Sequence, residues 1–213
     1  MRMIDQLAKV LAKVIFNKEN NNYDAAFNEV ENGLNNIVGL DYNLISALSD
    51  KDILSLLSLN KESAGIKCII IAKLLKEGTE LKALGKSQSA DLTYDYLKSL
   101  NLYLEGIPKN KDDKEILAAY DPDVDELINK IEQHNFSPEI RYKVFKYYEL
   151  QNKFGQASNE LFKLKSLGYD NINIEGIRFY ERLKELKDDE LKKGNITREE
   201  VQKGLNEFTN KYV

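Results

Sequence analysis

Apolar residues recur at intervals of three and four along nearly the whole of this 213-residue chain, and short polar breaks divide the sequence into paired segments. This interval is the period of an α-helix with one buried face, and pairs of helices joined by short breaks are typical of antiparallel helical hairpins. Only 3 prolines and 11 glycines are present, while the charged residues (31%) alternate in sign within the helical pattern. Such a composition argues against disorder and against a fold of strands and turns, so we predict an all-α protein.

Local signals set the ends of the expected helices. Thr197 and Glu200 have the spacing of a capping box, in which each side chain binds the backbone N–H of the other residue. Asp121 followed by Pro122 predicts a helix start, because aspartate caps a helix and proline fits its first turn. The predicted helices span residues 2–17, 22–38, 61–84, 87–105, 138–152, 154–167, 172–192 and 197–211, with short pairs of helices within 42–58 and 114–136.

The segment "GIPKNKDD", residues 106–113, is the clearest linker in the sequence. Gly106 and Pro108 both terminate helices, and the lysines and aspartates that come after them are typical of a solvated connection. We therefore predict an N-terminal helical-hairpin region at residues 1–106 and a C-terminal one at residues 113–213, packed together as one continuous domain.

Large and small side chains alternate in the same way in the second helix of three predicted hairpins. The three copies are Tyr23, Ala26 and Val30; Ala90, Tyr94 and Leu97; and Phe154, Ala157 and Leu161. A small residue at this place lets two helices approach closely, while large residues one turn away interlock. The recurrence indicates a helical repeat.

This pattern resembles the tetratricopeptide repeat, a helical hairpin of about 34 residues whose second helix carries an aromatic, an alanine and a large apolar residue. Tyr148 and Gly78 stand where that family places the tyrosine and the glycine of its first helix. The resemblance implies a short right-handed solenoid in which degenerate hairpins lie between the recognisable ones. More narrowly, the first half of the chain, with "NNYDAAFNEVENGLNNIVGLD" and "LLKEGTELKALG", is similar to an uncharacterised bacterial family of tetratricopeptide-like proteins, which implies no known activity.

Tetratricopeptide proteins often hold the C-terminal carboxylate of a partner with lysines and asparagines on the groove face of their first helices. The resemblance places this face on Leu11, Ile15, Leu75, Thr79, Tyr142 and Lys146, together with Ala8, Ala72 and Glu139. These residues do not make a carboxylate clamp. The predicted groove would instead be covered by an apolar peptide, by a second copy of the chain or by the protein's own intervening helices.

One acidic segment has the spacing of a calcium-binding loop. Asp121, Asp123 and Asp125 match the first three ligand positions of that loop, and Glu132 matches its last. Glu126, however, stands where the loop needs a glycine for its sharp turn. Acids in the first turn of a helix are explained equally well by the helix dipole, so we predict no metal site.

The other reactive side chains do not form a recognisable catalytic set. His134, the only histidine, lies near a predicted helix end, and Cys68, the only cysteine, stands among isoleucines and leucines as a small buried residue. The sequence contains no glycine-rich phosphate loop, nucleophile elbow or HExxH zinc motif. We therefore predict no catalytic residue, no cofactor and no enzymatic activity.

Charge and hydropathy restrict the partners. The net charge is −4, and the lysines and arginines are scattered among acids, whereas a nucleic-acid-binding protein presents a basic face. No apolar run approaches the ~18 residues of a membrane span. The N-terminal segment has the pattern of an amphipathic helix and not of a signal peptide, which favours a cytoplasmic protein.

Two functional hypotheses are compatible with these features. The leading one is a non-enzymatic helical-repeat scaffold that recognises a protein or a peptide, with a homodimer as one form of that interaction. The alternative is a ligand-responsive regulator or small enzyme that uses a cavity between the two helical halves. The lack of clustered titratable residues with catalytic spacing favours the scaffold.

Overall fold

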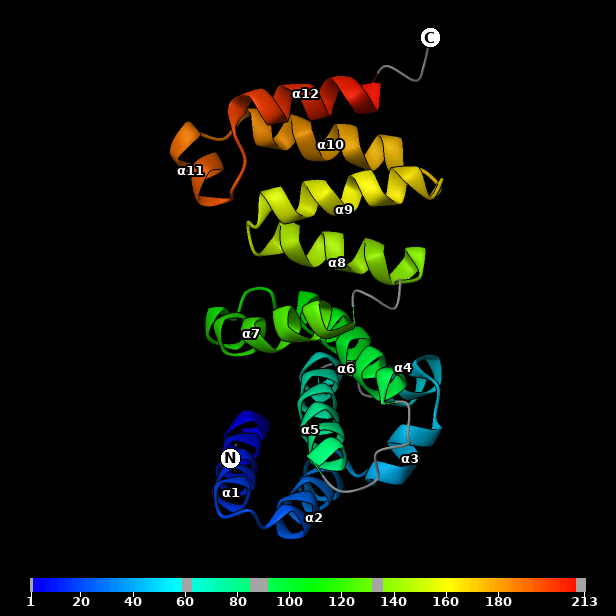
Figure 1. Ribbon diagram of the computed structural model, residues 1–213, viewed down its shortest axis with the longest axis vertical. Helices are drawn as coiled ribbons and strands as arrows, with labels where there is room; N and C mark the ends of the chain where they lie inside the picture. Colours follow the sequence, from blue (N-terminus) through cyan, green and yellow to red (C-terminus); the bar gives the residue numbers. More distant parts are fainter. Residues whose placement is uncertain (1, 59–62, 85–91, 132–135, 210–213) are drawn as a thin grey trace. The chain divides into compact units, whose positions relative to one another are not determined.

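The computed structural model describes residues 2–58, 63–84, 92–131 and 136–209, and every regular element formed by these residues is a helix (Figure 1). The prediction of an all-α fold is confirmed. The chain divides into two compact units, residues 1–135 and 136–213, each with a hydrophobic core of its own. No helix within the described ranges is both long and apolar enough to cross a membrane.

Unit 1 is organised around α5 (Ala64–Leu84), which is buried on most sides. α1 (Met3–Glu19) and α2 (Tyr23–Gly33) form a hairpin that packs against it, and α6 (Thr93–Gly106) packs along its length (Figure 1). The remaining elements are the π-helical turn η1 (Leu34–Val38), α3 (Tyr42–Ala47), α4 (Asp50–Ser58), the 3-10 turn η2 (Pro108–Asn110) and α7 (Lys114–Ile131). Apolar side chains point in several directions around α5, so this helix needs neighbours on several sides.

Tyr42 fixes α3 against α5. A Cβ added to Gly78 of α5 would overlap the Tyr42 ring, so only glycine allows this approach. The Tyr42 hydroxyl also lies 3.3 Å from Oγ1 of Thr79. An interior face of α5 is therefore covered by a helix that comes after the first hairpin in the sequence.

The amine of Lys98, on α6, closes the end of α3. It donates hydrogen bonds to the backbone carbonyl oxygens of Ile45 (2.9 Å), Ser46 (2.7 Å) and Leu48 (2.7 Å). An ammonium group has three donors, and the free carbonyls at a helix C-terminus attract positive charge, so one side chain satisfies this helix end. Burial lowers the pKa of Lys98 from its ordinary value.

The division between the units lies at residues 135 and 136, whereas the sequence suggested a linker at residues 106–113. Gly106 is the last residue of α6, and the side chain of Asn110 in η2 donates a hydrogen bond to its carbonyl oxygen (2.8 Å). α7 then packs against α6. Glycine and proline here make a tight turn within unit 1, so the predicted regions, residues 1–106 and 113–213, differ from the observed units.

α7 is one helix and not the predicted pair of short helices. Pro122 lies inside it, and a buried face continues across the proline from Ile116 to Val124. Asp121 therefore does not start a helix. The N-terminus of α7 is capped by Asp113, whose Oδ1 accepts two hydrogen bonds from backbone N–H groups of the first turn (both 3.1 Å). Proline removes one helical hydrogen bond, and the continuous apolar face offsets that loss.

Unit 2 contains two stacked hairpins. α8 (Pro138–Leu150) pairs with α9 (Phe154–Ser166), and α10 (Ile172–Lys184) pairs with α12 (Arg198–Thr209), with the short α11 (Asp188–Lys193) inserted in the second hairpin (Figure 1). The first helices meet through Phe145 and Phe179, whose ring centroids are 5.6 Å apart. The second helices meet through Phe162 and Phe208, at 5.3 Å. Between the hairpins α9 packs directly against α10, and these ring contacts add links from α8 to α10 and from α9 to α12.

The single helix predicted over residues 172–192 is two helices, α10 and α11. The guanidinium of Arg198 holds the break between them, because it donates hydrogen bonds to the carbonyl oxygens of Lys184 and Leu186 and to the carboxylate of Asp188. A long-range contact from α12 thus ends α10, and helical periodicity alone did not reveal it.

Two of the three predicted repeat copies place their alanine in the core. Ala26 and Ala157 are fully buried. The middle copy has a different register, since Tyr94 is exposed and Ala90 lies outside the described residues. α5 and α6 instead approach closely at Ser99, whose hydroxyl donates a hydrogen bond to the backbone of α5 (2.6 Å), and at Gly106, where a Cβ would overlap the carbonyl oxygen of Gly65.

Candidate functional site

In unit 1, the predicted groove residues do not share a surface. Leu75 and Thr79 are fully buried, and the Thr79 hydroxyl donates a hydrogen bond to the Leu75 carbonyl oxygen (2.7 Å). Tyr42 covers this side of α5, so the protein's own α3 fills what was predicted to be a groove. On α1, Leu11 is half-buried and Ile15 is 53% exposed. Leu75 and Thr79 are therefore core residues and present no surface to a partner.

In unit 2, Tyr142 and Lys146 lie half-buried on α8. The Tyr142 ring stacks on Tyr169 with centroids 5.5 Å apart. Nζ of Lys146 is 2.6 Å from the carboxylate of Glu149 and 3.9 Å from that of Glu175 on α10. Tyr142 thus connects α8 to the loop before α10, Lys146 connects α8 to α10 itself, and a partner on this face would have to displace these contacts.

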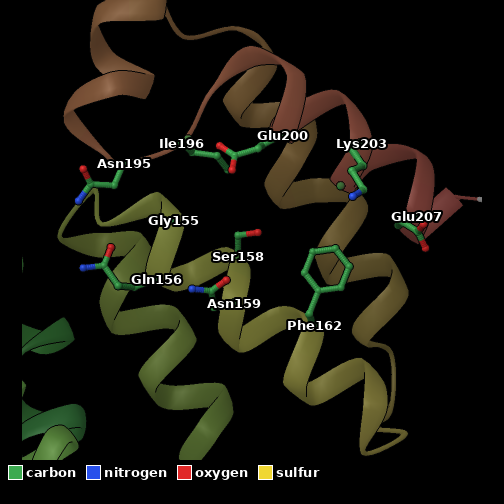
Figure 2. A pocket seen from close by; sticks show the side chains of 11 residues that line it. Gly155, Gln156, Ser158, Asn159, Phe162, Asn195, Ile196, Glu200, Lys203 and Glu207 are labelled. Carbon is green, nitrogen blue, oxygen red and sulfur yellow. The ribbon is translucent and has the colours of Figure 1, made fainter.

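A cavity of about 760 Å³ lies in unit 2 against the second helices of the two hairpins (Figure 2). Figure 2 shows the Ser158 and Phe162 side chains pointing from α9 toward α12, which carries Glu200 and Lys203. The complete lining is Gly155, Gln156, Ser158, Asn159, Phe162, Asn195, Ile196, Glu200, Lys203, Gly204 and Glu207. We call this surface the α9–α12 groove.

Close backbone packing shapes one end of the groove. The N–H of Gly155 donates a hydrogen bond to the carbonyl oxygen of Gly194 (2.8 Å), and a Cβ on Gly155 would overlap the carbonyl oxygen of Asn195. Asn195 has a φ of 56°, in the left-handed region that asparagine tolerates better than most residues. The loop before α12 therefore lies directly on α9 and limits the groove at this end.

Two further contacts fix the position of α12. A Cβ on Gly204 would overlap the ring of Tyr180, and the Tyr180 hydroxyl lies 2.6 Å from Oγ of Ser158 in the groove. Burial raises the pKa of Tyr180 to about 12, so the phenol stays protonated near neutral pH. The capping box predicted at the start of α12 is confirmed, because the N–H of Thr197 donates to Oε2 of Glu200 (2.8 Å) and the N–H of Glu200 donates to Oγ1 of Thr197 (3.2 Å).

The groove presents amides and an aromatic ring to solvent. Asn159 and Asn195 line it, and each side-chain amide offers both donors and an acceptor. The Phe162 ring is 39% exposed although it also packs on Phe208. This combination can bind polar main-chain groups and one apolar side chain at the same time.

The charges in the groove nearly balance. Lys203 is exposed on α12, and Glu200 and Glu207 lie about one turn of helix away on either side of it. The carboxylate of Glu207 lies 3.9 Å from Nζ of Lys165, and the same amine donates a hydrogen bond to the Glu207 carbonyl oxygen. The lining contains neither histidine nor cysteine, and no cluster of metal-binding side chains occurs among the residues that the structure describes.

A separate group of charged side chains lies in unit 1 between α1, α5 and α7. Lys76 is only 4% exposed. Its Nζ lies 2.7 Å from a carboxylate oxygen of Glu80, 2.8 Å from one of Glu126 and 3.3 Å from one of Asp123. The other ion pairs of this network are Lys73 with Glu77 and Asp123, and Lys18 with Glu77 and Glu80. We call these residues the α5 ionic network.

Ion pairing dominates the protonation of the α5 ionic network. Burial alone would lower the pKa of Lys76, but its hydrogen bonds to Glu126 and Glu80 raise that pKa above its ordinary value. Burial alone would raise the pKa of Glu77, but Lys73 and Lys18 lower it. Glu77 is therefore held ionised. This state suits a structural ion pair, whereas a general acid must carry a proton.

The segment with calcium-loop spacing is part of α7 and not a loop. Successive residues of a helix point around its circumference, so Asp121, Asp123 and Asp125 do not converge on one ion. Asp123 instead pairs with Lys73 at 3.0 Å. Glu132 and His134 lie outside the described residues.

Cys68, the only cysteine, is buried, as the sequence predicted. Burial raises the pKa of its thiol to about 11. The side chain is therefore a neutral thiol near neutral pH, and only a thiolate is a strong nucleophile.

The α9–α12 groove was missed by sequence reasoning, which looked for a groove on the first helices of the hairpins. The cavity lies against the second helices. The available signal was the set of glycines in and beside these helices, Gly155, Gly194 and Gly204, because a glycine within a helical pattern often marks a close approach.

The sequence model of a family described as "Family of unknown function (DUF6483)" matches residues 1–213. The match covers both units and the connection between them. No curated protein and no solved structure matches the sequence.

Proposed function

The chain belongs to this family of unknown function, and from its surfaces we propose that it is a non-enzymatic scaffold of helical-repeat type that binds a peptide segment of another protein in the α9–α12 groove. One observation carries the proposal: side-chain amides and a partly exposed phenylalanine line a cavity of about 760 Å³ between two helices. This volume falls within the range of about 300–1,000 Å³ that is usual for binding sites.

The chemistry of the lining suits a peptide in an extended conformation. Such a segment presents an unpaired N–H and C=O group at nearly every residue, and these groups need partners once they leave water. The amides of Asn159 and Asn195 can donate to the carbonyls and accept from the N–H groups. The exposed edge of Phe162 then offers an apolar contact to one side chain of the peptide.

The stacking in unit 2 supports the helical-repeat part of the proposal. The two hairpins pack through α9 and α10, ring contacts also join α8 to α10 and α9 to α12, and Ala157 is buried as the repeat pattern requires. We propose that unit 2 is a tetratricopeptide-like stack whose binding face is formed by the second helices. A carboxylate clamp on the first helices is not needed in this arrangement.

Selection from a library of random peptides displayed on phage, with the full-length protein as bait, tests the proposal. We expect enriched peptides whose affinity falls by about tenfold or more in Asn159→Ala and Phe162→Ala, because truncating a central contact of an interface typically has an effect of this size. Phe16→Ala on α1 is the matched control, since Phe16 is an exposed phenylalanine outside the groove, and it should leave the affinity unchanged.

The opposite pattern would contradict the proposed site. If the enriched peptides lost affinity in Lys146→Ala but not in Asn159→Ala or Phe162→Ala, the first helices would form the binding face. If no peptide were enriched over a bait-free selection, the proposal that the groove binds peptides would be wrong.

A further inference from the structure

A second cavity, of about 420 Å³, lies in unit 1 where the N-terminal parts of α1, α5 and α7 come together. Its walls are mainly apolar and include Met3, Ile4, Ile66, Ile116 and Ala119. We call it the unit 1 cavity. It shares no lining residue with the α9–α12 groove.

Two uncharged hydroxyl groups belong to residues that line the unit 1 cavity, those of Tyr120 and Ser63, and the Ser63 hydroxyl is buried with no hydrogen-bond partner among the described residues. Tyr120 is only 7% exposed, and its hydroxyl forms no hydrogen bond with any described residue. The ring is held in place by Tyr103, whose centroid lies 6.0 Å away and whose own hydroxyl donates to Asp123 (3.1 Å). The Tyr120 hydroxyl is not fully buried and can bond to solvent, so an acceptor in the cavity would replace that solvent as its partner.

The Tyr120 hydroxyl remains a donor over the whole physiological range. Burial, together with the nearby charge of Asp123, raises the pKa of Tyr120 to about 12. The group is therefore protonated and can donate a hydrogen bond into the cavity.

The charges at the mouth restrict the ligand further. Asp113 and Glu115 line the cavity together with Arg2, so carboxylates outnumber cations. An anionic ligand would meet this excess negative charge, and any charged group would have to leave water for apolar walls. A neutral ligand avoids both penalties.

We propose that the unit 1 cavity binds a neutral, mostly apolar small molecule that carries one hydrogen-bond acceptor, with the Tyr120 hydroxyl as the donor. The apolar walls supply affinity through the area that they bury, and the tyrosine selects molecules whose acceptor reaches it. The ligand class includes aromatic ketones, ethers and alcohols of moderate size.

Photolabelling of the full-length protein with benzophenone tests this proposal. Benzophenone is neutral and apolar, has one carbonyl acceptor, and on irradiation forms a C–C bond with a nearby C–H group, so mass spectrometry of the digested protein locates its binding site. We expect saturable labelling of the peptides that contain Met3, Ile66 or Ile116. The anion 4-benzoylbenzoate, which has the same photochemistry, should label these peptides at least about fivefold less.

Three variants complete the test. Ala119→Phe places a ring in the cavity and should abolish the labelling, whereas Ala118→Phe, at the neighbouring position outside the lining, should leave it unchanged. Tyr120→Phe removes only the donor. It should raise the benzophenone concentration needed for half-maximal labelling by about threefold to tenfold. Circular dichroism of each variant verifies that the helices are intact.

Either of two results would overturn the proposal. Labelling that was spread over the surface, or that persisted in Ala119→Phe, would show that the unit 1 cavity is not the binding site. Equal labelling by benzophenone and 4-benzoylbenzoate, with no effect of Tyr120→Phe, would show that neither neutrality nor the tyrosine donor selects the ligand.

Discussion

Asparagines near helix ends determine several turns of this protein. Asn21, Asn152, Asn171 and Asn195 all have φ values between 56° and 58°. Residues with a Cβ rarely adopt this left-handed conformation, and asparagine is the common exception because its short amide can bond locally. Each of the four lies in the short turn that precedes a helix, so these residues set the direction in which a new helix starts.

The first prediction concerns Asn152, in the turn between α8 and α9. Asn152→Ala should lower the free energy of unfolding by about 1 kcal/mol, because alanine has no side-chain bond to offset the left-handed conformation. Asn152→Gly should be nearly neutral, since glycine adopts positive φ freely. Urea unfolding measures both values, and equal effects of the two substitutions would be inconsistent with a backbone origin.

The second prediction concerns the close approach of α8 and α9 at Ala157, which is fully buried. Ala157→Leu should overpack this crossing and lower the free energy of unfolding by roughly 1–3 kcal/mol. The same leucine at exposed Lys187 should change it by less than about 0.5 kcal/mol. Thermal melts of the two variants compare these effects, and similar melting temperatures would show that the crossing has room for a larger side chain.

At the scale of elements, the α5 ionic network joins three helices of unit 1. Lys18 lies on α1, Lys73 and Lys76 on α5, and Asp123 and Glu126 on α7. Because each amine contacts at least two carboxylates, removal of one lysine leaves several charges poorly compensated. The network therefore sets the positions of α1 and α7 against the central helix.

The third prediction concerns the burial of Lys76. Lys76→Met should lower the free energy of unfolding by about 2 kcal/mol, because Asp123 and Glu126 lose a charged hydrogen-bond partner. Lys130→Met is the matched control, since Lys130 pairs with the same Glu126 from a more exposed position and should contribute less than about 1 kcal/mol. Comparable losses in the two variants would show that burial does not strengthen the network.

The fourth prediction is a pH dependence that arises from Glu77. Its folded-state pKa is lowered from an ordinary value of 4.5, so its contribution to stability is fully present above that value and is lost as the pH falls through the folded pKa. Urea midpoints should therefore decline below about pH 4.5, and Glu77→Gln should flatten this decline while lowering stability at neutral pH. An unchanged acid dependence in Glu77→Gln would mean that Glu77 titrates alike in the folded and unfolded states.

At the scale of the whole molecule, the sequence predicted most helices because their signals are local. The capping box of Thr197 and Glu200 is an example, since its two residues lie within one turn. The break after α10 was missed because it depends on Arg198, which comes from the next helix of the hairpin. A contact between residues that are far apart in the sequence does not change the periodic spacing of apolar residues, so the periodicity cannot reveal it.

The difference between local signals and contacts of distant residues also explains why a groove was predicted on α5 and why the α9–α12 groove was missed. Leu75 and Thr79 were assigned to a groove because α5 alone does not show that Tyr42 covers them. The α9–α12 groove exists because a loop crosses α9 at Gly155 and α12 packs on Tyr180. Both arrangements depend on contacts between residues that are far apart in the sequence. The local sign of each is a glycine at the point of contact, Gly78 in the first and Gly155 in the second.

One family model covers both units, but the two units carry cavities of different chemical character. Unit 2 carries the polar α9–α12 groove, and unit 1 carries the apolar cavity at Tyr120. The proposed peptide and the proposed small molecule therefore use separate surfaces of one chain. Each can be tested with the other site intact.

The central claim is that a peptide binds between α9 and α12, and the most direct test is titration of an enriched peptide into the ¹⁵N-labelled full-length protein. We predict that the largest backbone amide shifts occur in residues 155–162 and 195–207, and that Phe162→Ala weakens the titration about tenfold or more. Shifts centred on Tyr142, Lys146 and Tyr169, with no change at Asn159 or Asn195, would contradict the account.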